Sequence, residues 1–314
     1  MTNLFRRFGL LTVITVIGLI FVGGFVRASG SGMGCPDWPK CFGMWIPPTS
    51  IDQLPVNYAE IYGEKLKGEI VFNPTKTWIE YINRLFGVLT GIFIIISVFF
   101  SYKAYVKTKP VIFYLSFLAL ILVLLEGWLG AKVVSSELHP TMITVHMLLS
   151  LLILGLLLFA VLYSYRAEGY LKDLKGNRGL TFLIGIGIVL TVGQIIFGTQ
   201  IREGIDIAQK SLGEVGREQW VDTVIGKVWF HSGLGFSILL VQILLFLRIN
   251  KSSNQFSRKI TISTLLSVLL IIFSGMVLTF AGFPALIQPF HLTLSVVIIS
   301  LQFVSLFLFN VKNN

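Results

Sequence analysis

Residues 8–26 read FGLLTVITVIGLIFVGGFV, and residues 27–43 continue RASGSGMGCPDWPKCFG. The first part carries no charged residue and approaches the roughly 20 residues that cross a bilayer as a helix. It ends at Arg27, where a Gly-Ser-Gly turn leads to Cys35 and Cys41 around a rigid Pro-Asp-Trp-Pro core. The stretch therefore predicts a membrane span followed by a stiff loop just outside the membrane.

The composition extends this prediction to the whole chain. The protein is 54% hydrophobic and 13% charged, whereas soluble domains carry roughly 25% charged residues. Long apolar runs recur along the sequence, and they do not alternate as the strands of a membrane barrel would. We predict an all-α integral membrane protein with eight transmembrane helices. The apolar runs are Phe8–Val26, Trp78–Tyr102, Val111–Val134, Met142–Tyr165, Leu180–Gln200, Val228–Ile249, Ile260–Ala281 and Pro289–Phe309.

The formal net charge is +10, and the positions of the charged residues along the chain indicate a membrane topology. Lysines and arginines precede the first run and follow the even-numbered runs, while acidic residues gather in the alternate loops, most clearly within residues 203–222. Because cytoplasmic loops carry the excess of Lys and Arg, the N and C termini are both predicted to be cytoplasmic. This distribution explains the basic excess, so we expect membrane lipid around the spans and no nucleic acid partner.

The N-terminus also has features of a secretory signal peptide, namely a basic start and an apolar core. Its apolar run is long, however, and no small-x-small cleavage site precedes Arg27. We therefore expect a retained first span. No Arg- and Ser-rich transit peptide precedes it, which favours a bacterial plasma membrane over an organelle.

Cys35 and Cys41 are the two cysteines of the chain, and the topology places them on the oxidising outer side, where disulfides persist. A two-cysteine metal half-site lacks its other ligands here, and haem attachment requires Cys-x-x-Cys-His. Neither alternative fits the spacing, so we favour a disulfide that closes a small loop. Pro and Gly residues within 27–77 predict a folded cap with little regular structure.

Polar residues open the second span. Glu80 and Asn83 are three residues apart and share one helical face, with Arg84 beside them. A carboxylate about one turn inside the membrane is costly unless it faces a cavity or a partner. The plainer alternative is that Glu80 snorkels among lipid headgroups with Arg84. Glu126, near the middle of the third span, is a second buried carboxylate and a second functional candidate.

The chain has four histidines, and three of them fall at one depth. His146, His231 and His291 lie near the outer ends of the fourth, sixth and eighth spans, while His139 lies in the outer loop before the fourth. A single histidine within a span is more often a packing residue than a ligand. Three at the same depth on alternate spans predict a shared function.

Asn83 occupies the same depth on the second span, which indicates an internal repeat of four spans. We predict two pseudo-symmetric four-helix bundles, an N-terminal half of residues 1–170 and a C-terminal half of residues 171–314, each with a pocket near the outer surface. The aligned stretches are residues 83–87 with 231–235, 22–24 loosely with 192–194, and 127–128 with 275–276.

The residues that face each pocket differ between the halves. His231 and His291 face the C-terminal pocket, and two neutral imidazoles in an apolar setting suit axial ligation of a haem iron. Zinc or non-haem iron needs further ligands, and no obvious acid accompanies this pair. The N-terminal pocket has only His146, with Asn83 opposite and Glu80 one turn away, an arrangement more typical of a reaction chamber than of an electron carrier.

These features resemble the haem A synthase family. The resemblance rests on the loop GSGMGCPDWPKCFG after the first span, on the Glu80 motif, and on one histidine in each of the fourth, sixth and eighth spans; it covers nearly the whole chain. It implies a membrane oxidoreductase of cytochrome oxidase assembly. Such an enzyme oxidises the C8 methyl of haem O to the formyl of haem A through hydroxylated intermediates, with haem b as cofactor in the C-terminal half.

Residue by residue, the resemblance makes His231 and His291 the haem b ligands and His146 a ligand of the substrate haem. Glu80 becomes the catalytic residue that accepts protons as the methyl is oxidised, while electrons leave through haem b. The implied partners are haem O as substrate, a haem O synthase and terminal oxidase assembly proteins, and a homo-oligomer is a further expectation. The haem sites are expected near the outer face of the membrane.

One position departs from the family pattern, which has histidine where this chain has Asn83. The resemblance places Asn83 and Arg84 at the substrate haem, and it implies a disulfide between Cys35 and Cys41. Because Asn is a weak iron ligand, three outcomes stay open. His139 supplies the missing ligand, the substrate haem reacts with one axial ligand, or this half is inactive.

Two other classes of protein compete with the enzyme. A membrane cytochrome b with one bis-histidine haem would only transfer electrons, although it has no need of Glu80. A non-catalytic assembly protein would bind haem and hand it over, and Asn83 would mark lost catalysis. A transporter fits less well, because the spans lack paired Gly or Pro breaks at mid-membrane.

Overall fold

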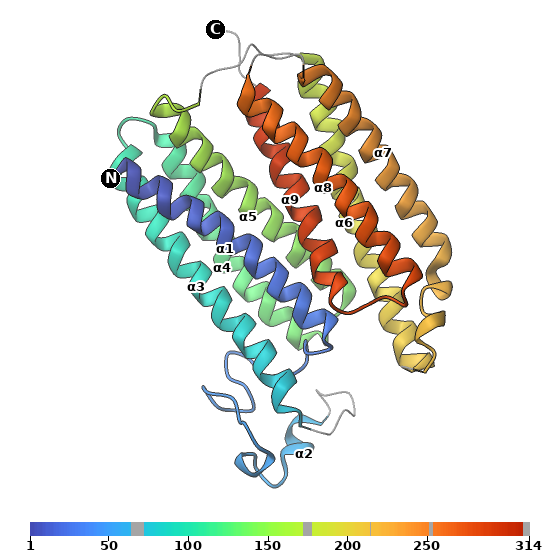
Figure 1. The fold of residues 1–314 in the computed structure, drawn as a ribbon. Helices are drawn as coiled ribbons and strands as arrows, with labels where there is room; N and C mark the ends of the chain where they lie inside the picture. The colour runs from blue at the N-terminus through green and yellow to red at the C-terminus, as the bar shows by residue number, and fades with distance from the viewer. Residues whose placement is uncertain (64–71, 172–177, 214, 251–253, 310–314) are drawn as a thin grey trace.

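The computed structural model describes residues 1–63, 72–171, 178–213, 215–250 and 254–309. Within these ranges eight helices are long and apolar enough to cross a membrane, so the predicted all-α fold class is confirmed. Figure 1 shows that α1 begins and α9 ends at the same end of the bundle. The long helices are α1 (Thr2–Ala28), α3 (Pro74–Tyr105), α4 (Pro110–Ser135), α5 (Pro140–Ala167), α6 (Arg178–Leu212), α7 (Ile225–Ile249), α8 (Gln255–Phe280) and α9 (Ile287–Phe309).

Local sequence signals fix where several of these helices begin. The side chain of Asn73 accepts a hydrogen bond from the backbone N–H of Lys76 at 3.1 Å, and Pro74 follows at the first helical position of α3. Pro110 and Pro140 stand at the starts of α4 and α5. A capping Asn satisfies a free backbone N–H, and Pro is tolerated at this position because its missing N–H would have no partner there.

The helices form two rings of contacts. In the first ring α1 contacts α3, α3 contacts α4, α4 contacts α5, and α5 contacts α1; helices α6, α7, α8 and α9 repeat this order. The rings meet where α9 contacts α1 and α5, and where α5 contacts α6. Helices α5 and α9 are the most buried of the long helices, so they form the centre of the molecule. The predicted boundary between residues 170 and 171 stays a prediction.

Small residues allow close approach at this centre. A Cβ at Gly155 of α5 would lie 3.2 Å from the ring of Phe303 on α9, and a Cβ at Gly9 of α1 would lie 2.7 Å from Val161 on α5. Helix association in a membrane depends on such close packing, because lipid is as apolar as the side chains. Exposed Leu, Ile and Phe side chains on the outer helices are correspondingly free to face lipid.

Helix α6 is longer than the apolar run that predicted it. The sequence indicated Leu180–Gln200, but the helix continues to Leu212. Ile201, Ile205 and Ala208 are buried and cluster with Trp220, so a helically spaced apolar stripe holds the extension against the segment that precedes α7. Acidic residues expected in an outer loop therefore lie partly on a helix.

The segment between α1 and α3 forms the cap that the sequence predicted, with little regular structure in its described part. In its described residues, 29–63 and 72–73, the regular elements are the short helices η1 (Ile51–Gln53) and α2 (Tyr58–Tyr62). In Figure 1 this part lies at the end of the bundle opposite to the start of α1. It has a small apolar core of its own. The buried members of this core are Cys35, Cys41, Phe42, Leu54 and Phe72.

Candidate functional site

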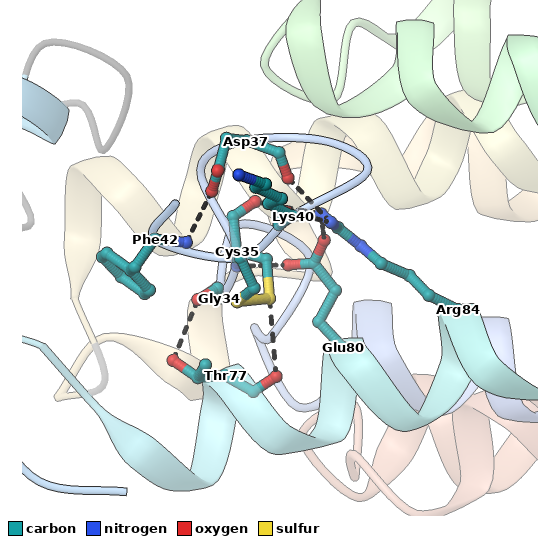
Figure 2. A network of polar contacts seen from close by, with 9 residues as sticks. Gly34, Cys35, Asp37, Lys40, Phe42, Thr77, Glu80 and Arg84 are labelled. Atoms are coloured by element: carbon teal, nitrogen blue, oxygen red, sulfur yellow. Dashed lines mark hydrogen bonds and ion pairs between the residues drawn. A yellow bond between two sulfur atoms is a disulfide. The ribbon is translucent and has the colours of Figure 1, made fainter. Parts of the chain in front are cut away.

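Residues 29–63, which follow α1, are called the outer loop after their predicted side of the membrane. Glu80 and Arg84 hold the Cys35–Cys41 part of this loop on the first turns of α3 (Figure 2). Glu80 is 3% exposed; its Oε2 accepts a hydrogen bond from the backbone N–H of Cys35 at 2.7 Å, and its Oε1 accepts one from Arg84 at 2.5 Å. Arg84 also donates to the carbonyls of Cys35, Asp37 and Lys40 at 3.1, 2.7 and 3.0 Å. Charge-assisted hydrogen bonds of this kind are about twice as strong as neutral ones.

A disulfide and a close backbone contact complete the attachment. Cys35 and Cys41 are joined by a disulfide bond, and the hydroxyl of Thr77 donates to the carbonyl of Gly34 at 2.9 Å. A Cβ at Gly34 would overlap the carbonyl of Lys76, so the loop lies on α3 at a distance that only glycine permits at this position. The loop is thus docked on the helix that carries Glu80.

The structure places Glu80 and Arg84 beneath this loop. The alternative that Glu80 snorkels among headgroups requires an exposed carboxylate, whereas Glu80 is buried with each oxygen accepting a hydrogen bond. Arg84 accompanies it, as that alternative assumed, but the guanidinium binds loop carbonyls. The catalytic role of Glu80 and the placement of Arg84 at a substrate stay predictions.

Four residues that the sequence predicts at one depth are called the histidine layer: Asn83, His146, His231 and His291. Each of them faces a glycine of the preceding long helix. Glycine has no side chain, so the ring or amide of the next helix can approach the backbone of its neighbour. The distances from a Cβ built on the glycine to the facing side chain are 3.9 Å for Gly23 to Asn83, 3.5 Å for Gly130 to His146, 3.5 Å for Gly198 to His231, and 3.3 Å for Gly275 to His291.

If the two halves are aligned as the predicted repeat, this contact pattern favours one register. Gly23 corresponds to Gly198 and Gly130 corresponds to Gly275, because each pair faces equivalent positions of the layer. The sequence alignment of residues 22–24 with 192–194 was therefore displaced, as was that of residues 127–128 with 275–276. Apolar helices offer few distinctive residues, and abundant glycines allow several alignments that only the contacts can separate.

His231 and His291 come together in the C-terminal ring of helices. Their ring centroids lie 6.3 Å apart with an angle of 43° between the ring planes. Imidazole–metal bonds measure about 2 Å, so two rings on opposite sides of one metal ion have centroids roughly 6 Å apart. Among the described residues no group of three or more His, Cys, Asp or Glu side chains could hold a metal ion. The ligand pair suits a haem iron, whose equatorial ligands belong to the porphyrin.

The Nδ1 atoms of the three histidines have different neighbours. Nδ1 of His291 lies 2.8 Å from the hydroxyl of Ser274. Nδ1 of His231 is buried without a hydrogen-bond partner in the described part of the chain, although Gln194 donates to the His231 carbonyl at 2.8 Å. Nδ1 of His146 lies 3.3 Å from a carboxylate oxygen of Glu126.

Asn83 and His139 differ in their settings. The Oδ1 atom of Asn83 is buried, and no hydrogen-bond partner exists for it among the described residues. His139 is exposed in the turn before α5, at the position that precedes the first helical residue. The structure therefore leaves a buried polar atom at the position where the family pattern has histidine.

Charged residues join the two rings of helices at the end where the outer loop lies. Arg27, at the end of α1, contacts Asp206 of α6 at 2.8 Å, and Arg202 contacts the other oxygen of Asp206 at 2.8 Å. Arg27 and Arg202 each follow a glycine of the layer by four residues. Sequence reasoning counted Asp206 only as an acidic loop residue, because the extension of α6 was not expected.

Comparison with known proteins decides the family. The model of the cytochrome oxidase assembly protein family (COX15-CtaA) matches residues 6–303. The chain belongs to this family. Among similar proteins, the heme A synthase of Rickettsia felis is 22% identical over 329 residues, covering 95% of this chain and 96% of that protein. The heme A synthase of Shewanella oneidensis is 27% identical over 188 residues, which cover 60% of this chain and 54% of that protein.

A third similar protein is the heme A synthase of Wolbachia sp. subsp. Brugia malayi, 31% identical over 203 residues, which cover 59% of this chain and 58% of that protein. The chain therefore spans little more than half of the Shewanella and Wolbachia proteins and nearly all of the Rickettsia felis protein. The resemblance drawn from the loop motif and the histidines is confirmed at the level of the cytochrome oxidase assembly protein family. Eight apolar helices and bacterial relatives indicate a multi-pass plasma membrane protein.

Glu126 is the site residue that sequence reasoning left without a partner. It precedes Gly130 by four residues, so both lie on one face of α4, and Gly130 is the glycine that faces His146. That spacing was a readable signal. Its meaning depended on which helix lies against this face of α4, and only the folded structure shows that this helix is α5.

Proposed function

We propose that this protein is a haem A synthase, which oxidises the C8 methyl group of haem O to a formyl group through hydroxylated intermediates. The family match over residues 6–303 supports this proposal, as do relatives named heme A synthase. The observation that carries it is the asymmetry of the two rings. One has a pair of facing imidazoles, while the other has a single His146 beside a carboxylate.

The C-terminal ring would hold haem b between His231 and His291. The imidazole centroids of this pair lie 6.3 Å apart, so both side chains would be able to hold one haem iron, and Gly198 and Gly275 leave room for the imidazoles against the neighbouring helices. Bound there, haem b supplies one-electron transfer to and from the reaction. His231 and His291 would hold haem b through their imidazole nitrogens, and the apolar helices around it would keep water away.

The N-terminal ring would bind the haem substrate. His146 binds its iron, Asn83 lines the same site, and Glu80 accepts protons released as the methyl group is oxidised. Arg84 contributes by fixing the Glu80 carboxylate and the loop above it. The Glu80 carboxylate has acceptor positions beyond the hydrogen bonds from Cys35 and Arg84, and a proton from the substrate or from a water molecule would bind at one of these positions.

A non-catalytic haem-handling protein is the second candidate, and a specific observation favours it. Each oxygen of Glu80 is already engaged by the loop or by Arg84, and Asn83 removes one family ligand. In that case the outer loop would act as a cover over a stored haem. The bis-histidine cytochrome b alternative shares the C-terminal ring and predicts no second haem at all.

The setting of the reaction follows from the topology. The Lys and Arg residues before the first span and after the even-numbered spans predict cytoplasmic termini, so the haem sites and the disulfide loop would lie toward the outer face. A haem O synthase and assembly proteins of the terminal oxidase are the proposed partners, because one supplies the substrate and the others receive the product. A homo-oligomer is also part of the proposal.

Complementation tests this function in cells. The protein is expressed in bacteria whose own haem A synthase gene is deleted, and haem A is measured in membranes from the reduced-minus-oxidised absorption spectrum. We expect haem A with the wild-type chain and with Ser232→Ala, a matched control beside a ligand position. We expect none with His231→Ala or His146→Ala. Wild-type membranes that contain the protein with haem b but no haem A would overturn the proposal in favour of a haem-handling protein or cytochrome b.

A further inference from the structure

Glu126 lies where an acidic residue is costly, and its only ionisable neighbour among the described residues is a histidine. Its side chain is 12% exposed on α4, and Oε1 lies 3.3 Å from Nδ1 of His146 on α5. The second oxygen, Oε2, is buried and has no hydrogen-bond partner in the described ranges. A carboxylate within a membrane helix persists where it faces a partner or a cavity, and His146 is that partner.

The backbone of α4 defines how the His146 ring is held. Gly130 lies one helical turn after Glu126, and a Cβ there would be 3.5 Å from Cε1 of His146. Two neighbouring atoms of the ring, Nδ1 and Cε1, are therefore turned toward α4. The other nitrogen, Nε2, is left as the atom that can bind an iron on the opposite side.

The three histidines of the layer differ in the group that lies beside Nδ1. His291 has a neutral hydroxyl, that of Ser274, beside its Nδ1. His231 has no hydrogen-bond partner at Nδ1 within the described residues. Only His146 has a carboxylate there. A carboxylate that accepts a hydrogen bond from a ligand histidine fixes its tautomer and makes the other nitrogen a stronger electron donor.

We propose that Glu126 is the positioning residue of the substrate site: it accepts the Nδ1–H of His146, so that Nε2 carries the lone pair that binds the iron of the haem substrate. This inference deepens the proposed function and rests on it. The present 3.3 Å contact lacks the alignment of a full hydrogen bond. Such contacts often tighten only when the ligand is bound.

The contact between Glu126 and His146 also bears on Asn83, which stands where the family pattern has histidine. With Asn83 in the layer, His146 is the one imidazole that the N-terminal ring offers to an iron, whereas the C-terminal ring offers two. His146 would then bind the substrate iron without a second imidazole. A carboxylate behind His146 strengthens that one bond. Glu126 therefore lies in the N-terminal ring of helices, where a single imidazole would bind the iron and a stronger bond matters most.

Resonance Raman spectroscopy of the purified full-length protein tests the role of Glu126. The protein is loaded with haem b as the probe and reduced. A bis-histidine haem is six-coordinate, so an iron–histidine stretching band of a five-coordinate haem reports on His146 alone. The variants are Glu126→Gln, which keeps the shape and removes the charge, and Glu126→Leu, which removes the acceptor. Ser274→Ala is the matched control, since it removes the Nδ1 neighbour of His291 instead.

We expect the iron–histidine band to move to lower frequency in Glu126→Gln, and haem affinity at this site to fall roughly 10- to 100-fold in Glu126→Leu, the usual effect of losing such a partner. The six-coordinate spectrum should be unchanged in both variants, which shows that the fold is intact. Ser274→Ala should leave the band in place. If Glu126→Leu fails to fold, the isosteric Glu126→Gln decides alone.

Two results would overturn the inference, and they can be told apart. An unchanged band and unchanged affinity in both Glu126 variants would show that the carboxylate does not position His146, while the substrate site itself stands. A wild-type protein that shows the six-coordinate haem but no five-coordinate band, under saturating haem b, would remove the His146 site. That second result would contradict the proposed function together with the inference.

Discussion

Asn83 shows how much one residue can change a haem site. Its Oδ1 atom is buried without a hydrogen-bond partner among the described residues, against Gly23 of α1. A buried polar atom without a partner costs about 1–3 kcal/mol. Such an atom is expected to be retained where a ligand or substrate supplies the missing contact. The residue therefore marks the N-terminal site without providing an imidazole to it.

Asn83→His should add a second axial ligand to the substrate site. Because Gly23 leaves space beside this position, we expect the five-coordinate haem of the N-terminal ring to become six-coordinate and low-spin. Absorption and electron paramagnetic resonance spectra of the haem-loaded protein measure this change. Asn57→His, which adds a histidine at the remote start of α2, is the control. A high-spin signal that persists in Asn83→His would show that this position does not face the iron.

Glu80→Gln separates chemistry from loop attachment. Proton transfer by a positioned side chain contributes about 10²–10⁴-fold to a rate, so haem A formation should fall by at least about 100-fold. The haem b spectrum should be retained, because His231 and His291 lie on other helices. Pyridine haemochrome spectra and chromatography of extracted haems give both readings. The exposed Glu60 supplies the control Glu60→Gln. Loss of haem b in Glu80→Gln would instead make the residue structural.

At the level of elements, α3 and the outer loop form one unit. The loop attaches to α3 through Arg84, Thr77 and the buried carboxylate of Glu80. Its own apolar core surrounds the disulfide. The sequence predicted the cap and favoured the disulfide, because Pro, Gly and Cys have strong local meaning. It did not predict that Glu80 would bind the loop backbone, since that contact joins segments far apart in the chain.

Removing the disulfide should loosen this unit without affecting the haem b site. Closing a loop of this size stabilises a fold by about 2 kcal/mol in the chain-entropy account. We expect Cys35→Ser combined with Cys41→Ser to make the loop sensitive to limited proteolysis, with cleavage sites mapped by mass spectrometry. The low-spin haem spectrum should not change. Equal protease resistance of the variant and the wild type would show that Arg84 and Glu80 suffice to hold the loop.

At the level of the whole molecule, the two rings of helices meet where α9 contacts α1 and α5 and where α5 contacts α6, and charges link them at the end where the outer loop lies. Asp206 binds Arg27 of α1 and Arg202 of its own helix. The exposed fractions of the three side chains lie between 14% and 33%, so solvent screens the attraction. The apolar centre, where α5 and α9 pack closely, carries most of the stability.

Asp206→Asn should therefore lower stability only modestly, by about 1 kcal/mol or less, because it leaves Arg27 and Arg202 without their shared counter-ion. Thermal unfolding in detergent, followed by circular dichroism, measures the effect. Added salt should reduce the difference between variant and wild type, since exposed charges are screened. Glu218→Gln, at an exposed acidic residue, is the control. A loss that does not depend on salt would show that Asp206 acts through packing instead.

Sequence patterns predicted the large-scale architecture well and its inner contacts poorly. Apolar runs predicted the eight spans, since a bilayer restricts spanning segments to long apolar helices, while the orientation predicted from charge asymmetry stays a prediction. The glycines that set the repeat register, and the contact of Glu126 with His146, depend on which helix faces which. Hydropathy does not indicate which helices pack against each other. The extension of α6 was missed because its stripe, Ile201, Ile205 and Ala208, is amphipathic rather than wholly apolar.

Mass spectrometry of extracted haems tests the central claim most directly. The full-length protein is expressed with a haem O supply in cells that make no haem A, then purified, and its haems are separated by chromatography and weighed. The account predicts haem A, or its hydroxylated precursor, together with haem b. Haem b alone, with haem O recovered unchanged, would contradict the assignment of haem O oxidation to this protein.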